Sequence, residues 1–188
     1  MERHRRGKLG VATIFSGTLL LFIVFGATPT ADAREKWGPF RGQVVDLETG
    51  VPIAGAVVLA IWWENEPNPI QPKQKFYEAK EAVTDASGRF EIPRLPPPFF
   101  TFQIFDPQFT VFAPAYVWRG TLITPKGGER FVDPTVIEMR PLKTREELWK
   151  KSRAWPVMVP LDKMPEFIKA VNAERQMLGL PPEGRKQR

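Results

Sequence analysis

The chain has 188 residues, of which 43% are hydrophobic and 26% are charged. This length accommodates one ordinary domain with short extensions, and the composition excludes a disordered tract and a polytopic membrane protein. Cysteine is absent, and histidine occurs once, as His4. Part of the net charge of +6 lies near the two ends of the chain, whereas nucleic-acid binding needs a basic stripe on a folded face. We therefore predict no nucleic-acid partner.

The N-terminus has the three parts of a secretory signal peptide. Basic residues cluster between positions 3 and 8, residues 11–27 are apolar, and Ala31-Asp32-Ala33 is an A-x-A cleavage site. We predict cleavage after Ala33 and a location in the periplasm or outside the cell. The alternative is an uncleaved inner-membrane anchor through residues 11–27, because this stretch approaches the length of a membrane-spanning helix. An exported domain without disulfides needs a sizeable hydrophobic core.

Residues 40–142 alternate short apolar runs with turn signals, which is typical of an all-β sandwich. The run 54–63 is apolar at both parities and is predicted to be a central, covered strand or to carry an exposed patch. Gly50 is predicted to take a positive φ in a turn. Three prolines predict a loop over 64–75. We expect seven strands, at 40–46, 54–63, 76–84, 89–92, 99–105, 109–118 and 135–140, with the fifth and sixth paired around Asp106-Pro107.

After position 141 the apolar residues recur with the spacing of an α-helix. Thr144 and Glu147 form a capping box that opens a helix through residue 151. A second helix is predicted over 163–178, with Gly179 as its stop and Pro181 beyond it. We predict that its apolar stripe docks on the sandwich; a partner-binding or membrane-surface helix is the alternative. The stripe consists of Met164, Phe167, Ile168, Val171 and Leu178.

Three motifs occur in order, GQVVD at 42–46, TGVPIAGAVV at 49–58 and TDASGRFEI at 84–92. Together they resemble the carboxypeptidase regulatory-like domain, a transthyretin-like seven-stranded sandwich found beside carboxypeptidase catalytic domains and in many bacterial envelope proteins. The resemblance implies a mainly β, Greek-key sandwich and a noncatalytic accessory or interaction module. This sequence contains no carboxypeptidase catalytic domain, and the helical tail lies outside the resemblance. We expect a signal peptide or anchor at 1–33, the sandwich at 38–142, and a helical extension with a basic tail at 143–188.

The residue inventory limits the chemistry. Cleavage after Ala33 would leave a chain with neither histidine nor cysteine, which excludes histidine acid/base catalysis, thiol catalysis and conventional zinc sites. The same count excludes the histidine-dependent purine-pathway hydrolases of the transthyretin-like fold. Turn carboxylates at Asp46, Glu48 and Asp85 could gather calcium, or a carboxylate pair could hydrolyse glycosides, but aspartates in turns usually cap local amides. We predict no catalytic residue, metal or cofactor.

Aromatic residues supply the candidate contacts. Adjacent Trp62 and Trp63 must point to opposite faces of a strand, so at most one of them faces the core. The other is either covered by the C-terminal helix or exposed as a sugar-stacking platform. The candidate ligand or partner contacts are Trp62, Trp63, Tyr116, Trp118, Phe167 and Val171.

The sequence thus predicts an exported, non-enzymatic module with a structural or protein-interaction role in a bacterial cell envelope. Its partner is an unidentified envelope protein or glycan. One alternative is a carbohydrate-binding module that uses an exposed tryptophan. The other is a membrane-anchored accessory subunit of an envelope complex.

Overall fold

The computed structural model describes residues 36–67, 73–99, 103–118, 134–152 and 158–183. The export segment and the basic tail expected from the sequence lie outside these residues. None of the helices in the described ranges is long and apolar enough to cross a bilayer. The elements in these ranges are β1 (Phe40–Asp46), β2 (Val57–Glu66), β3 (Lys73–Val83), β4 (Arg89–Ile92), β5 (Gln108–Phe112), β6 (Thr135–Met139), α2 (Arg145–Ser152), a 3-10 turn η1 (Leu161–Lys163) and α3 (Pro165–Met177).

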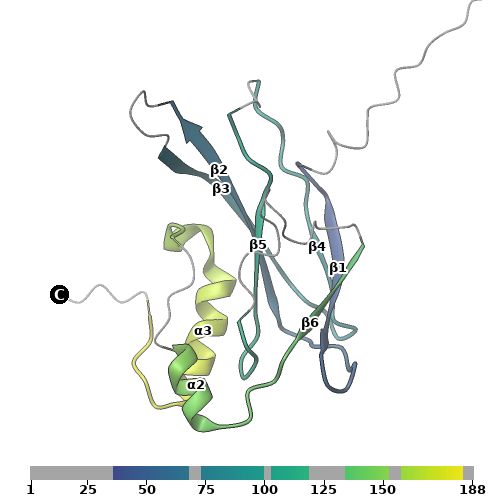
Figure 1. Cartoon of the computed structure of the whole chain (residues 1–188), viewed down its shortest axis with the longest axis vertical. Coiled ribbons are helices and arrows are strands. Elements are labelled where there is room, and N and C mark those ends of the chain that lie inside the picture. Colours follow the sequence, from purple (N-terminus) through teal and green to yellow (C-terminus); the bar gives the residue numbers. More distant parts are fainter. Residues whose placement is uncertain (1–35, 68–72, 100–102, 119–133, 153–157, 184–188) are drawn as a thin grey trace, which may run out of the picture.

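The described strands form two three-stranded sheets, in the orders β4-β1-β6 and β3-β2-β5. β1 is antiparallel to β4 and parallel to β6, whereas β2 is antiparallel to both of its neighbours. The sheets pack on each other through a shared core, and α3 lies on the outer side of β3-β2-β5 (Figure 1). The prediction of a mainly β protein with a helical C-terminal part is confirmed.

β2 separates two hydrophobic cores, because successive side chains of a strand point to opposite faces. We call the cluster between the sheets the inner core and the cluster between β3-β2-β5 and α3 the outer core. Of the two alternatives that the sequence left open for this run, a covered central strand or an exposed patch, the structure has the covered central strand. β2 contributes Val58, Ala60 and Trp62 to the inner core and Val57, Leu59 and Ile61 to the outer core.

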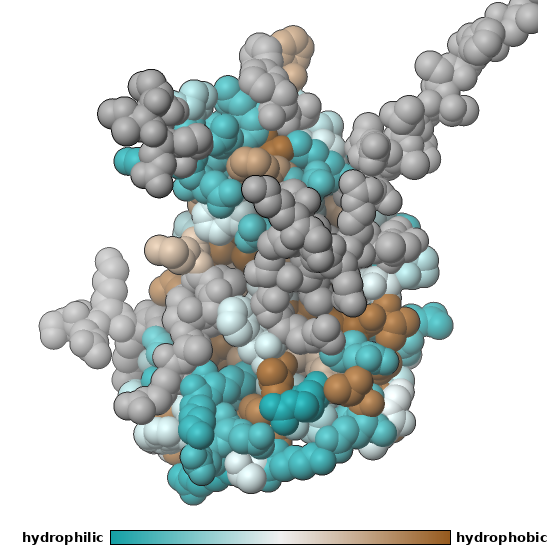
Figure 2. Space-filling view, viewed as in Figure 1, coloured by the Kyte–Doolittle hydropathy of each residue, from teal (hydrophilic) through white to brown (hydrophobic). Residues whose placement is uncertain are grey.

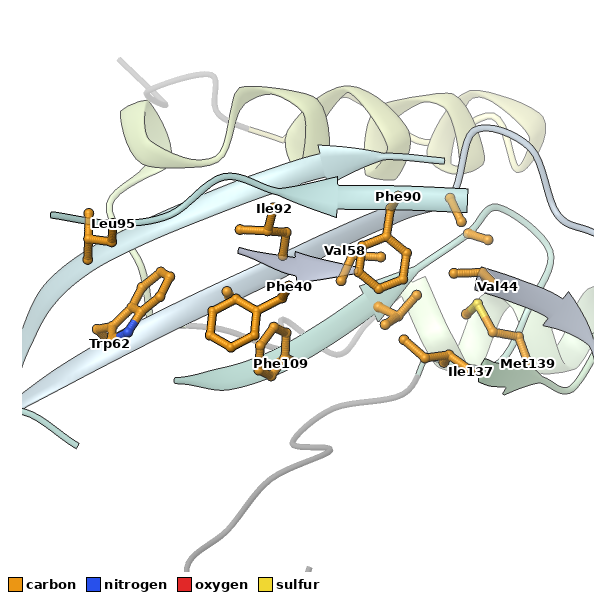
Figure 3. Close-up of a cluster of buried hydrophobic side chains, with 14 of the residues drawn as sticks. Phe40, Val44, Val58, Trp62, Phe90, Ile92, Leu95, Phe109, Ile137 and Met139 are labelled. Carbon is orange, nitrogen blue, oxygen red and sulfur yellow. The ribbon is translucent and has the colours of Figure 1, made fainter. Parts of the chain in front are cut away.

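Aromatic side chains fill much of the inner core (Figure 3). The ring of Phe40 meets Phe109 edge to face, with centroids 4.9 Å apart, and lies 6.2 Å from the ring of Trp62. The Trp62 Nε1 donates a hydrogen bond of 2.9 Å to the Lys36 carbonyl. The only polar atom of this side chain is therefore satisfied while the ring is buried.

The described residues contain six strands, one fewer than the sequence predicts. Residues 99–105 were expected to pair with the following strand, but within the described part they contribute only an isolated bridge from Ile104 to Glu64 of β2. β5 also pairs with β2, so the two segments follow one another along the same neighbour. Pro107 interrupts them because it has no N–H to donate to the ladder.

Strand boundaries also differ from the prediction. β2 continues to Glu66 and β3 begins at Lys73, so the intervening loop is shorter than the expected 64–75. β5 ends at Phe112 instead of continuing to 118. The chain turns there, because Ala115 has a φ of 66° and the Tyr116 N–H bonds to the Ala113 carbonyl at 3.2 Å.

The turns of the three sequence motifs form as expected. Gly50 has a φ of 70°, which confirms the left-handed turn predicted there, and Gly88 has a φ of 71°. The buried Thr84 hydroxyl donates to the Ile53 carbonyl at 2.6 Å and accepts the Ala56 N–H at 2.8 Å. These bonds fix the second motif to the third.

The helical tail follows the predicted stripe. The capping box forms, with the Glu147 N–H on Thr144 Oγ1 and the Thr144 N–H on Glu147 Oε2, both at 3.2 Å. α3 begins at Pro165 rather than 163, because η1 occupies the preceding residues. All five stripe residues are buried or partly buried, and four of them pack in the outer core: Met164, Phe167, Ile168 and Val171. The predicted docking on the sheet is confirmed.

A side chain from the sheet caps α3. The residue before the helix, Met164, provides no side-chain cap. Instead, the carboxylate of Glu81 in β3 accepts the N–H groups of Glu166 at 2.6 Å and Phe167 at 3.0 Å. This contact satisfies two of the free N–H groups at the start of the helix and orients α3 on the sheet.

Candidate binding site

A cavity of about 340 Å³ lies where α2 and α3 meet the ends of β5 and β6. We call it the seam cavity. Its volume is at the lower end of the range for small-molecule sites. Its apolar lining consists of Phe112, Val117, Trp118, Leu142 and Val171, and its charged lining of Arg140, Glu147, Lys150, Lys151, Glu174, Arg175 and Glu183.

The chain segments after β5 and β6 form one wall of the cavity. The Val117 N–H donates to the Arg140 carbonyl at 2.8 Å, and the Leu142 N–H donates to the Ala115 carbonyl at 2.7 Å. This short antiparallel contact joins the edges of the two sheets. It brings two apolar residues and one arginine of the lining to the same place.

A buried ion pair forms the floor between the helices. Lys151 Nζ lies 2.6 Å from Glu174 Oε2, and the lysine also donates to the Ala113 carbonyl at 3.0 Å. The same Glu174 oxygen accepts the Ala115 N–H at 2.9 Å, and the lysine Nζ lies 3.9 Å from the centre of the Phe112 ring. Burial lowers the pKa of Lys151, and Glu174 opposes that shift. Each charge contacts the other and a backbone group of the segment after β5, so the pair holds α2 and α3 against this segment.

Arg140 and Glu147 lie on the rim. The guanidinium contacts the carboxylate through Nη1 and Oε1, which are 3.4 Å apart. The other oxygen, Oε2, accepts the N–H groups of Lys143 at 2.9 Å and Thr144 at 3.2 Å. These two N–H groups hold the pKa of Glu147 below its ordinary value. Glu147 is therefore fixed by the helix cap, whereas among the described residues the half-exposed guanidinium of Arg140 is held only through Nη1.

The remaining charged lining residues are paired. Arg175 Nη1 lies 2.9 Å from Glu183 Oε1, and its Nε donates to the Pro181 carbonyl at 2.6 Å. Lys150 pairs with Glu146 at 2.9 Å, with about three quarters of each side chain exposed. The first contact closes the C-terminal side of the cavity, and the second lies at its surface.

The structure brings two of the predicted contact residues to the seam cavity, Trp118 and Val171. Tyr116 directly precedes the lining residue Val117 in the chain, but its hydroxyl donates to Asp46 Oδ2 at 3.1 Å. Burial and this carboxylate raise the pKa of Tyr116. The lining from α2 and the end of β6 was missed, although the capping box at Glu147 was a visible signal for that segment.

The other three predicted contacts lie elsewhere. Trp62 has no exposed surface in the inner core, and Phe167 has none in the outer core. Trp63 is partly buried beside the outer core; its Nε1 donates to Gln108 Oε1 at 3.1 Å, and its ring meets Phe76 edge to face. Trp62 therefore faces the core, and Trp63 lies on the face of the sheet that α3 covers. A sugar platform on Trp62 is incompatible with this packing.

The turn carboxylates bind their own backbone. Asp46 Oδ1 accepts the N–H groups of Thr49 at 2.9 Å and Glu48 at 2.8 Å, and these bonds, with the Tyr116 hydroxyl, lower the pKa of Asp46. The Glu48 carboxylate pairs with Lys143 at 2.7 Å. Two of the three carboxylates considered for calcium are therefore occupied by local contacts.

Asp85 behaves in the same way. Its Oδ1 accepts the Ser87 hydroxyl at 2.7 Å and the N–H groups of Ser87 and Arg89, and these bonds lower the pKa of Asp85. Across the described ranges, no three His, Cys, Asp or Glu side chains are grouped as metal ligands. The carboxylates act as turn caps.

Comparisons with known proteins name no family. No protein-family model matches the chain, and no curated protein matches it. Among solved structures, the chain is similar to a 9R-lipoxygenase from Cyanothece PCC8801, with 16% identity and a TM-score of 0.32. The similarity covers 77% of this chain and 25% of the lipoxygenase chain. So weak a likeness shows neither fold nor activity.

Proposed function

We propose that this protein is an exported, non-enzymatic module that binds a partner in the bacterial cell envelope. The observation that supports this most directly is the seam cavity, which has apolar walls and charged groups engaged with one another or with the backbone. Such a lining favours recognition over bond-making chemistry. The composition agrees, since the chain has no cysteine and its one histidine, His4, precedes the apolar stretch 11–27.

For residues 38–142 we propose the carboxypeptidase regulatory-like, transthyretin-like Greek-key sandwich. The positive φ of Gly50 and Gly88 and the two bonds of the Thr84 hydroxyl support the turns on which the resemblance depends. An experimental structure tests the proposal. A seventh strand with Greek-key connections would support it, and six strands with another connectivity would contradict it.

Export is tested at the mature N-terminus. N-terminal sequencing of protein purified from the envelope is expected to begin at Arg34, directly after the A-x-A site. A first residue upstream of Val11 would instead support the membrane-anchored accessory subunit. Release into the soluble envelope fraction without detergent is the accompanying check on the anchor.

Binding at the seam cavity is tested by photocrosslinking in cells. A photoreactive residue at Lys150, on the rim, is expected to give a discrete adduct. The matched control is a photoreactive residue at Val136, which is 63% exposed at the start of β6. Adducts of the same size from both positions, or from neither, would contradict a macromolecular partner at the cavity.

The tryptophan that best fits the carbohydrate-binding alternative is Trp118, because this indole lines the cavity, whereas Trp62 is buried and Trp63 is partly buried on the face that α3 covers. Tryptophan fluorescence titrated with cell-wall glycans tests it. A saturable change that is lost in Trp118→Ala supports a sugar site. A flat response over a broad glycan panel removes this alternative.

A further inference from the structure

We infer that the seam cavity takes a compact ligand with an apolar body and one carboxylate, and that Arg140 binds the carboxylate. This inference rests on the proposed binding function and specifies the ligand. It depends on three observations: the size of the cavity, the apolar character of its inner lining, and the incomplete pairing of one cation on its rim.

The size and lining define the apolar body. A volume of about 340 Å³ holds on the order of ten water-sized volumes, which corresponds to one large side chain and its backbone atoms. The apolar walls come from the sheets and from the helical tail. Phe112 is the last residue of β5, and Trp118 follows β5. Leu142 follows β6, and Val171 lies on α3. An apolar group that enters this space transfers part of its surface from water to these walls, which is favourable.

The charge of the lining favours an anion. It contains one more basic than acidic side chain. Lys151 and Arg175 are committed to Glu174 and Glu183, and the carboxylate of Glu147 is held by its helix cap. Because these acidic groups already have partners, they would bind a cationic ligand weakly. The basic side chains of the rim instead attract a carboxylate.

Arg140 has more unused N–H donors than the lysines of the described lining. Among the residues that the structure describes, its guanidinium makes a single contact, from Nη1 to Glu147 at 3.4 Å, and its side chain is 49% exposed. A guanidinium presents five N–H donors in a planar fork that matches a carboxylate. A ligand carboxylate can therefore bind Arg140 in a bidentate manner. Lys150 is the poorer anchor, because it is more exposed and flexible and lies 2.9 Å from Glu146.

Two sources carry this chemistry, a free small acid and the apolar C-terminal residue of a polypeptide. The test uses calorimetry on the purified exported protein with matched probes. 4-Phenylbutanoate represents the free acid and acetyl-Gly-Gly-Phe the polypeptide end, each compared with its uncharged amide. We expect an acid to bind and its amide to bind at least about tenfold more weakly, because the amide lacks the charge that Arg140 recognises.

Variants assign the binding to Arg140. Arg140→Gln is expected to weaken binding of the acid about tenfold. The control Lys169→Gln removes an exposed cation of α3 that does not line the cavity, and should change the affinity by less than about twofold. Val171→Phe fills the cavity and is expected to abolish binding of both acids. Thermal unfolding of each variant shows whether it is folded. Equal binding of acid and amide, an unchanged affinity in Arg140→Gln, or no binding of either acid at millimolar concentration would overturn the inference.

The outcomes separate the two sources and the two proposals. Tighter binding of phenylbutanoate assigns a free acid, and tighter binding of the tripeptide assigns a polypeptide end. A crosslinked partner at position 150 without binding of either acid overturns the ligand assignment and leaves the binding function standing. Acid binding without any crosslinked partner supports the ligand assignment and contradicts a macromolecular partner.

Discussion

Lys151 Nζ lies 2.6 Å from Glu174 Oε2 at a place where the two side chains are only 9% and 3% exposed. The pair joins α2 to α3, and each partner also bonds to backbone at the end of β5. In sequence the two residues belong to separate helices of the tail. Their pairing makes both helices part of the same folded unit as the sheets.

Breaking this pair is expected to be costly. Lys151→Met leaves the Glu174 charge buried and unpaired, which costs about 3–5 kcal/mol of unfolding free energy. Chemical denaturation measures it. The matched control is Lys150→Met, which removes an exposed pair with Glu146 and should change stability by less than about 1 kcal/mol. Similar small effects in both variants would show that the pair contributes little. Adding Glu174→Leu to Lys151→Met should recover part of the loss.

The cap that Glu81 places on α3 gives a second prediction. Glu81→Ala removes the acceptor for the Glu166 and Phe167 N–H groups, and should lower stability by about 0.5–2 kcal/mol. Hydrogen exchange checks the cause, since these two amides should lose protection more than the amides of α2. Glu91→Ala is the control, because this carboxylate is exposed on the other sheet. Unchanged exchange at both amides would contradict the cap.

The features that the sequence predicts well are local. The apolar residues of β2 at both parities predict either cover on two sides or an exposed patch, and the structure covers them with the second sheet and α3. The Thr144 and Glu147 capping box and the positive φ of Gly50 depend only on neighbouring residues. Such signals need no knowledge of the tertiary arrangement.

The features that the sequence missed join distant parts of the chain. Glu81 and Phe167 are 86 residues apart, and nothing near Glu81 marks it as a helix cap. The seam cavity likewise depends on how α2 and α3 dock. Residues 99–105 are predicted to form a strand because they are apolar. Within the described residues, Ile104 instead bridges to Glu64 of β2, in line with β5 along the same strand. Periodicity cannot decide which neighbour a strand takes.

The face of the molecule seen in Figure 2 has separate groups of apolar residues among hydrophilic ones. Truncation of the C-terminal part should add to the exposed apolar surface of the protein. Removing residues 161–188 exposes the outer-core residues Val57, Leu59 and Ile61, which are now buried. We expect the truncated protein to aggregate in light-scattering measurements. A soluble, equally stable truncation would show that α3 is not needed as a cover. Met177→Ala is the control, since this α3 residue is 67% exposed.

Two glycines with nearly the same φ, Gly50 and Gly88, are expected to respond differently to substitution. At Gly88 an added Cβ would lie 2.5 Å from the Val44 carbonyl, whereas at Gly50 it would meet nothing within 4 Å. Gly50→Ala should cost about 1–2 kcal/mol, the strain of a left-handed residue with a side chain. Gly88→Ala adds a backbone clash to the same strain and should cost more. Denaturation midpoints compare the two, and equal losses would contradict the close approach.

The loss of stability at acidic pH is predicted to depend in part on Asp85. The Ser87 hydroxyl and the Arg89 N–H favour its charged form and lower its pKa in the folded state. The unfolded chain therefore binds a proton more readily, so stability falls as the pH drops below about 4, toward the lower folded-state pKa. Asp85→Asn keeps an acceptor oxygen without the charge and should flatten this fall in unfolding midpoints measured between pH 5 and 2. Between pH 6 and 8 the variant and the parent should show the same slope. A parallel acid slope in the variant would mean that other groups cause the loss.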